Sequence, residues 1–248
     1  MGNGFFLGIE TSSIVTGLAL VKNETIHYEL SFLTGSKHNE TIFQLITDAL
    51  KLVGIKVADL SGVGVSIGPG MFTSLRVGLA LAKGLALPYQ IPVKGINTLD
   101  ALVYSIVNFN KNNGLVIPII DARKEEVFTA FYRKKQRISE YLILKPEQLA
   151  ARISDMSRAQ QLEKTADQEI KSIILVGNGL KKYGAILENI IPDRFNSIFL
   201  EAPLPATIAF EAQRSINSGD VSDPATLQPF YLRPTDAELK RHSPEVKV

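Results

Sequence analysis

Apolar residues follow two different periods along this chain of 248 residues, which predicts a mixed α/β structure. Residues 5–9 and 14–21 form apolar, β-branched runs typical of strands, and 24–33 completes a third strand. From 39 to 53 the apolar residues recur at helical spacing instead. The chain therefore begins with three short strands and a first amphipathic helix.

The next segment centres on a glycine turn. A buried strand is expected over 62–65, followed by Gly68-Pro69-Gly70 and by strong helix formers up to Ala86. A strand over 91–96 and a helix over 98–107 complete the first half, with Thr98 as a candidate N-cap. Three antiparallel strands, a helix, a strand, a helix and a further strand are typical of a ribonuclease-H-like unit.

The second half repeats this order after a predicted linker at 111–114. A strand over 115–120 ends at Asp121, as the first strand ends at Glu10, and a second glycine turn begins at Gly177. Glu10 and Asp121 are separated by nearly the same length of chain as Gly68 and Gly177, which indicates a duplicated unit.

We therefore predict an α/β fold of two tandem ribonuclease-H-like lobes, the second degenerate. The expected ranges are 1–110 and 115–217, followed by an extended C-terminal tail over 218–248. Paired lobes of this kind make up the actin, sugar-kinase and Hsp70 superfold, although a fold by itself does not establish a function.

The acidic residues and the glycine turns are the candidate chemistry of these lobes. In the superfold, the acidic residue after the first strand of each lobe points into the cleft that holds nucleotide phosphates. Backbone N–H groups at a glycine turn before a helix also favour anions. Most such turns in α/β proteins bind nothing, however. The candidates that face phosphate or nucleotide are Glu10, Thr11, Ser12, Gly68, Gly70 and Asp121.

The helix after the first glycine turn carries a stripe of small residues. Ser74, Gly78 and Ala82 recur every four residues, flanked by Leu75 and Leu79. A helix face without bulky side chains permits close approach of another backbone. The alternative is packing inside the helix's own lobe. We predict that these five residues form a partner interface.

Composition narrows the class of protein. The chain has 27 basic and 25 acidic residues, so a contact with RNA is expected only together with a partner. It contains no cysteine, which excludes disulfides and thiol chemistry. No apolar run approaches the roughly 20 residues of a membrane span. We expect a cytoplasmic protein without membrane contact.

Histidine usage argues against a metal site. The three histidines, His27, His38 and His242, include no pair at ligand spacing within one helix. No nucleophile and base stand together in the sequence either, although sequence distance does not exclude such a pair. We predict neither catalytic nor metal-binding residues.

Several segments in this order resemble the TsaB (YeaZ) family of bacterial tRNA threonylcarbamoyladenosine biosynthesis proteins. The resemblance covers nearly the whole chain and is weakest from Arg152 to Pro224. The matching segments are Leu7-Gly-Ile-Glu-Thr-Ser12, Ser66-Ile-Gly-Pro-Gly70, Phe72-Thr73, Leu75-Arg-Val-Gly78, Pro92-Val93, Asn97-Thr-Leu-Asp100, Asp121-Ala-Arg123 and Tyr231-Leu-Arg-Pro234.

The resemblance implies a role beside a related enzyme. TsaB is similar to TsaD, which transfers a threonylcarbamoyl group to the adenosine next to the anticodon and carries a His-x-x-x-His metal motif. Gly95 and Leu99 stand where those histidines would be, so neither position ligates a metal. Met71 replaces a usual serine in the glycine turn, and Ser74 a usual glycine in the stripe. The first change weakens the phosphate prediction, whereas the stripe stays small.

The resemblance implies a non-catalytic subunit that binds and activates TsaD directly, with TsaE in the same complex. It also implies a homodimer when TsaD is absent, tRNA contact only through the complex, and no cofactor bound by this chain alone. ATP or ADP would lie at the complex interface. The alternatives are a small-molecule kinase or ATPase using Glu10, Asp121 and the glycine turns, and a metallopeptidase, which the missing ligands disfavour.

Overall fold

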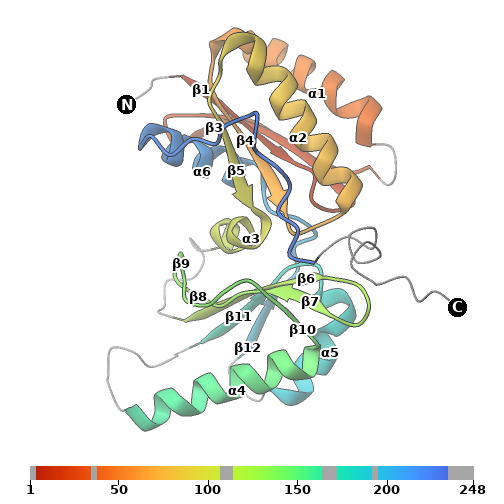
Figure 1. Cartoon of the computed structure of the whole chain (residues 1–248), viewed down its shortest axis with the longest axis vertical. Helices are drawn as coiled ribbons and strands as arrows, with labels where there is room; N and C mark the ends of the chain where they lie inside the picture. Colours follow the sequence, from red (N-terminus) through yellow and green to blue (C-terminus); the bar gives the residue numbers. More distant parts are fainter. Residues whose placement is uncertain (1–3, 35–37, 107–113, 164–171, 192–194, 234–248) are drawn as a thin grey trace, which may run out of the picture.

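The first lobe is built on a five-stranded sheet with the strand order β3-β2-β1-β4-β5 (Figure 1). The structure is a computed structural model that describes residues 4–34, 38–106, 114–163, 172–191 and 195–233. Strands β1 to β3 are antiparallel, whereas β4 and β5 run parallel to β1. The strands are β1 Phe5–Glu10, β2 Val15–Lys22, β3 Thr25–Leu33, β4 Leu60–Gly68 and β5 Val93–Asn97.

The second lobe repeats this path as β10-β7-β6-β11-β12, with the hairpin β8–β9 joined to β6. Its β6–β7 and β7–β10 pairs are antiparallel and its β6–β11 and β11–β12 pairs parallel, as in the first sheet. The matching orders confirm the predicted α/β fold of two ribonuclease-H-like lobes. The strands are β6 Leu115–Asp121, β7 Val127–Thr129, β8 Tyr132–Arg133, β9 Gln136–Arg137, β10 Leu142–Leu144, β11 Ile173–Val176 and β12 Phe195–Ile198.

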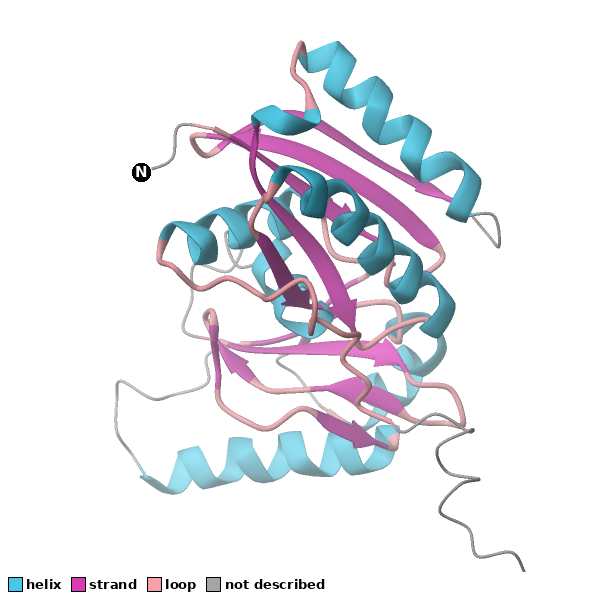
Figure 2. Cartoon of the chain, turned by 45° about the horizontal axis from the view of Figure 1, so that its top comes forward, coloured by secondary structure: helices cyan, strands magenta, loops and turns pink. Residues whose placement is uncertain are grey.

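Two helices cover one face of each sheet, and they lie at opposite ends of the molecule (Figures 1 and 2). Helices α1 and α2 pack their apolar sides on β1, β2 and β4 to form the main core of the first lobe. Helices α4 and α5 do the same for β6 and β11. The bounds are α1 His38–Val53, α2 Phe72–Ala86, α4 Pro146–Glu163 and α5 Leu180–Ile190, with 3-10 turns η1 Val57–Asp59 and η2 Leu87–Tyr89.

The last helix of each lobe packs on the sheet of the other lobe. Helix α3, Thr98–Ile106, buries Leu102 and Val103 against Val116 and Ile174 of the second sheet. Helix α6, Pro205–Asn217, packs on the first sheet, where an added Cβ at Gly8 would overlap its backbone. The sequence ranges predicted for the lobes assign each helix to its own repeat. In the structure, each of these helices buries apolar side chains on the inner sheet face of the other lobe, where they are removed from water.

A segment without regular secondary structure, residues 218–233, leaves α6 and runs from the first lobe to the second (Figure 1). We call it the strap. It corresponds to the first part of the extended tail expected over 218–248. The remainder of that tail, His242, most of the predicted linker and the polar stretch 164–171 lie outside the described residues.

Candidate functional site between the lobes

A cavity of about 760 Å³ lies between the lobes, beside the ends of β1, β4 and β6. The first lobe contributes its first loop and the beginning of α2, and the second lobe contributes the residues after β6. The strap supplies the third wall. The lining includes Ser12, Ser13, Pro69, Gly70, Phe72, Thr73, Arg76, Asp121, Arg123, Lys124, Asn178, Glu201, Phe230, Tyr231, Leu232 and Arg233.

Glu10 does not reach this cavity. Its side chain is 0% exposed, and its Oε1 accepts hydrogen bonds from the Ser12 N–H and Oγ–H, both at 2.5 Å. Oε2 has no hydrogen-bond partner among the described residues. Burial raises the pKa of Glu10 from 4.5 to about 7, against the lowering effect of the Ser12 bonds. The prediction that Glu10 faces phosphate is therefore wrong for this structure.

Thr11 is buried as well, beneath α2. An added Cβ at Gly78 would overlap Thr11 Oγ1, so α2 lies directly on the loop after β1. Thr11 is 0% exposed and also does not face the cavity. Of the predicted set, the structure places Ser12, Gly70 and Asp121 at the cavity wall. Their binding of phosphate stays a prediction.

The first glycine turn is held by the protein itself. The Met71 N–H donates to the Ser12 carbonyl at 2.8 Å, so one amide of the turn is already used. An added Cβ at Gly70 would overlap the same carbonyl, which explains the need for glycine. Gly68 has φ +115° and lies against the Phe230 carbonyl of the strap. The turn thus joins three segments of the chain.

Asp121 stands in the corresponding place of the second lobe but in a polar environment. Its Oδ1 accepts hydrogen bonds from the Arg123 N–H at 2.9 Å and the Tyr183 hydroxyl at 3.3 Å, and lies 3.9 Å from Lys182 Nζ. The Asn178 side chain accepts from the Asp121 N–H at 3.1 Å. The second lobe keeps its acidic residue at the cavity and partly in contact with solvent.

An aromatic and cationic cluster at the cavity mouth was not among the predicted site residues. The Arg76 guanidinium lies 3.8 Å from the centre of the Phe72 ring, and its Nε–H donates to the Tyr231 hydroxyl at 2.9 Å. The Phe72 and Tyr231 rings stack at 5.1 Å. Arg76 and Tyr231 both occur in segments that carried the family resemblance, which was the available signal.

The stripe of small residues on α2 faces inward, which contradicts the predicted partner interface. Ser74, Leu75, Gly78, Leu79 and Ala82 are all buried against the first sheet and the loop after β1. The spacing correctly indicated close helix packing, but the neighbour is the helix's own lobe. The opposite side of α2 is the solvent-exposed one, and it includes Thr73, Ala80 and Gly84.

The described residues lack two features that other functions would need. No group of three or more histidine, cysteine, aspartate or glutamate side chains among them is arranged to hold a metal ion. His27 packs edge-on against Phe5, with ring centres 5.0 Å apart. In the same part of the chain, no helix combines the length and hydrophobicity of a membrane span.

Comparisons with known proteins agree with the sequence motifs. The model of the TsaD family, described as tRNA N6-adenosine threonylcarbamoyltransferase, matches residues 32–229. TsaB of Bacillus subtilis, a tRNA threonylcarbamoyladenosine biosynthesis protein, is 27% identical over 236 residues, which cover 94% of this chain and 96% of that protein. TsaB of Escherichia coli is 30% identical over 159 residues, 61% of this chain and 67% of the relative.

Enzymes and solved structures extend these comparisons. The tRNA N6-adenosine threonylcarbamoyltransferase of Nitratidesulfovibrio vulgaris is 32% identical over 148 residues, which span 54% of this chain but only 40% of the enzyme. The structure of YeaZ from Pseudomonas aeruginosa superposes with a TM-score of 0.72 at 19% identity, covering 92% of this chain and 100% of that one. This structural likeness confirms the fold.

Proposed function

This chain belongs to the TsaD family (tRNA N6-adenosine threonylcarbamoyltransferase), and from that premise we propose that it is a non-catalytic subunit that binds and activates TsaD. Its TsaB-named relatives indicate a role in tRNA threonylcarbamoyladenosine biosynthesis. The single observation that carries the non-catalytic assignment is the pair of residues that stands in place of the metal-binding histidines.

Those two positions offer no room for a metal ligand. Gly95 lies in β5, where an added Cβ would crowd Ile67 and Leu227, and Leu99 is fully buried in the core around α3. Neither glycine nor leucine has a donor atom for a metal. A threonylcarbamoyl transfer that needs the two-histidine site must therefore come from the partner.

The same reasoning applies to nucleotide. Glu10 is fully buried, and the strap fills the space beside Gly68. Both features support our proposal that this chain alone binds no ATP or ADP tightly, and that a nucleotide lies at the interface of the complex. We propose further that TsaE joins this complex, that tRNA is contacted only within it, and that the protein is cytoplasmic and forms a homodimer when TsaD is absent.

The outer helices of the first lobe supply a surface for TsaD in place of the buried stripe. Helices α1 and α2 lie side by side on the first sheet (Figure 1) and contact each other. Phe43 and Leu52 of α1 are 59% and 77% exposed, and Leu87 just after α2 is 57% exposed. The small residues Ala80 and Gly84 are exposed on the same surface. Large exposed apolar side chains around small residues are suited to packing against a helix of a partner.

Reconstitution tests the activation. TsaD and TsaE are incubated with tRNA, ATP and threonylcarbamoyl donor precursors, and modified adenosine is measured with and without this chain. We expect product only, or much faster, with the chain present, and none from the chain alone at any metal concentration. An unchanged TsaD rate, or chelator-sensitive activity of the isolated chain, would contradict the proposal.

A matched pair of substitutions tests the surface. Ala80→Arg places a long cation on the exposed side of α2, and Ala151→Arg does the same on exposed α4 of the second lobe. We expect Ala80→Arg to weaken TsaD binding at least tenfold, about 1.4 kcal/mol, without lowering the melting temperature. Ala151→Arg should bind as wild type. Equal affinities of the two variants would exclude this face.

A further inference from the structure

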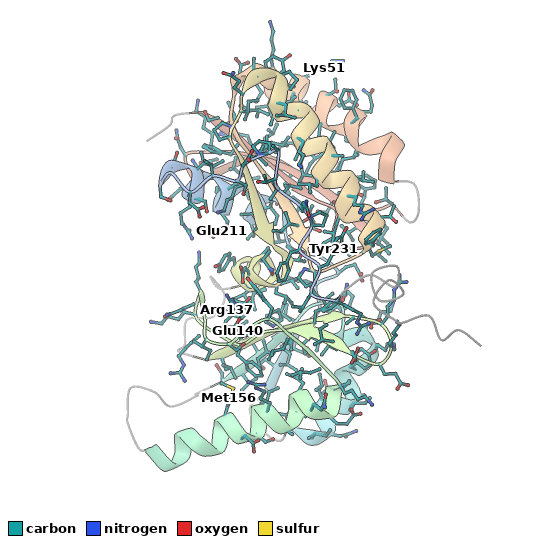
Figure 3. The ribbon with its side chains drawn as sticks, viewed as in Figure 1. Lys51, Arg137, Glu140, Met156, Glu211 and Tyr231 are labelled. Carbon is teal, nitrogen blue, oxygen red and sulfur yellow. The ribbon has the colours of Figure 1, made fainter. Side chains whose placement is uncertain are left out.

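The strap connects the two lobes at the cavity, separately from the buried packing of α3 and α6. Figure 3 shows Tyr231 where the strap passes between the lobes. Four consecutive strap residues, Phe230, Tyr231, Leu232 and Arg233, line the cavity wall.

The beginning of the strap is attached to the edge of the first sheet. The Ser222 N–H donates to the Val93 carbonyl at 2.8 Å, and Ser222 Oγ accepts from the Gly95 N–H at 3.2 Å. Farther along, the Phe230 N–H donates to the Ile67 carbonyl at 2.7 Å. The strap thus lies beside β5 and then passes next to the first glycine turn.

The end of the strap is attached to the second lobe. Arg233 Nη1 donates to the Ala122 carbonyl at 3.0 Å, and its Nη2 forms an ion pair with Glu126. The Phe230 ring packs edge-on against Tyr141, with ring centres 5.2 Å apart. The Arg233 and Glu126 side chains are only 21% and 32% exposed. Their charge-assisted contact is therefore a stronger anchor than a fully solvated ion pair.

We propose that the strap is a built-in tether that sets the opening between the lobes, in the place where a bound ligand would otherwise bridge them. Widening the cavity must separate Arg233 from Glu126 or Phe230 from Ile67, because the intervening chain between these anchors is only a few residues long. The tether therefore favours one opening of the cavity over wider ones.

The tether also touches the helix assigned above to partner binding. Tyr231 stacks on Phe72 and accepts from Arg76, both in the first turns of α2. A displacement of α2 at this end therefore changes the contacts of the strap, and the reverse holds by linkage. This coupling rests on the proposed function, whereas the tether itself does not.

The test is a distance measurement on the isolated full chain. The protein has no native cysteine, so introduced cysteines can be labelled selectively. Spin labels are attached at Lys51→Cys on α1 and Glu147→Cys on α4, two exposed sites in opposite lobes. Arg233→Glu reverses the charge that contacts Glu126. We expect a longer mean distance and a broader distribution than in the labelled parent.

Two further variants make the result decisive. Adding Glu126→Arg to Arg233→Glu restores an opposite pair and should return the distribution toward that of the parent. Lys181→Glu, the same charge change on exposed α5 of the same lobe, should leave it unchanged. A distribution unaffected by Arg233→Glu, no recovery in the double variant, or an equal shift with Lys181→Glu would overturn the tether. Since TsaD is absent, these outcomes do not depend on the proposed function.

Discussion

Glu10 and Asp121 end the first strands of two lobes with the same topology, yet the structure treats them in opposite ways. Glu10 is fully buried, whereas the Asp121 side chain is 34% exposed at the cavity. The surroundings of each acidic residue account for the difference. Glu10 follows Phe6 and Gly8 on the face of β1 that α6 covers, whereas α5 places Tyr183 and Lys182 beside Asp121.

The difference teaches that two lobes with the same strand order can give acidic residues at matching strand ends opposite environments. In the second lobe, the Tyr183 hydroxyl donates to a carboxylate that remains partly solvated. Duplicated lobes can therefore keep the same fold while only one of them keeps its acidic residue at the cavity.

The largest expected effect comes from the proton on Glu10. Its pKa of about 7 lies above the value of 4.5 for an unfolded glutamate, so the folded state binds the proton more tightly. This stabilisation is fully present below pH 4.5 and is lost as the pH rises through 7. Glu10→Gln has no such proton to lose. The free energy of unfolding of Glu10→Gln, relative to that of wild type, should therefore rise by up to about 3 kcal/mol from acidic to alkaline pH.

Urea unfolding at about pH 5 and about pH 9 measures this gain, with each variant compared with wild type at the same pH. A stability difference that is equal at the two pH values would contradict a buried, proton-binding Glu10. It would also remove the contrast between the two lobes.

The second expected effect concerns the close contact between α2 and the loop after β1. Gly78→Ala adds a methyl group that overlaps Thr11, and should destabilise the protein by about 1–3 kcal/mol through overpacking. Gly184→Ala in α5 is the matched change in the second lobe, where nothing lies within 4 Å of the added Cβ. It should be stabilising by about 0.5–1 kcal/mol. Thermal unfolding of both variants checks the signs, and a tolerated Gly78→Ala would refute the tight packing of α2 on Thr11.

The smallest expected effect is the loss of the hydrogen bond to Asp121, which is compared with the loss of the hydroxyl contact to Glu10. Tyr183→Phe removes a 3.3 Å hydrogen bond to the partly solvated Asp121 and should cost less than about 1 kcal/mol. Ser12→Ala removes the 2.5 Å hydroxyl contact of buried Glu10 and should cost about 1–3 kcal/mol. If denaturant unfolding gives equal losses for the two variants, burial does not distinguish the two sites.

The site was only partly predictable from the residues. Ser12, Gly70 and Asp121 reach the cavity as their positions at strand ends and turns indicated. Arg76 and Tyr231 were missed because they are far apart in the chain and contact each other only in the folded protein. No local sequence pattern indicates such a contact. The four-residue stripe identified a closely packed helix face, but the same spacing fits a partner helix and an internal loop equally well.

The sequence by itself determined the order of strands and helices, the duplication and the family, because apolar periodicity and contiguous motifs are local properties. The tertiary structure alone decided which face of α2 is buried, that α3 and α6 exchange sheets, and that the strap crosses the cavity. Each of these depends on which distant surfaces exclude water from one another. Glu10 illustrates the difference: its identity is in the sequence, but its raised pKa depends on burial that only the folded chain supplies.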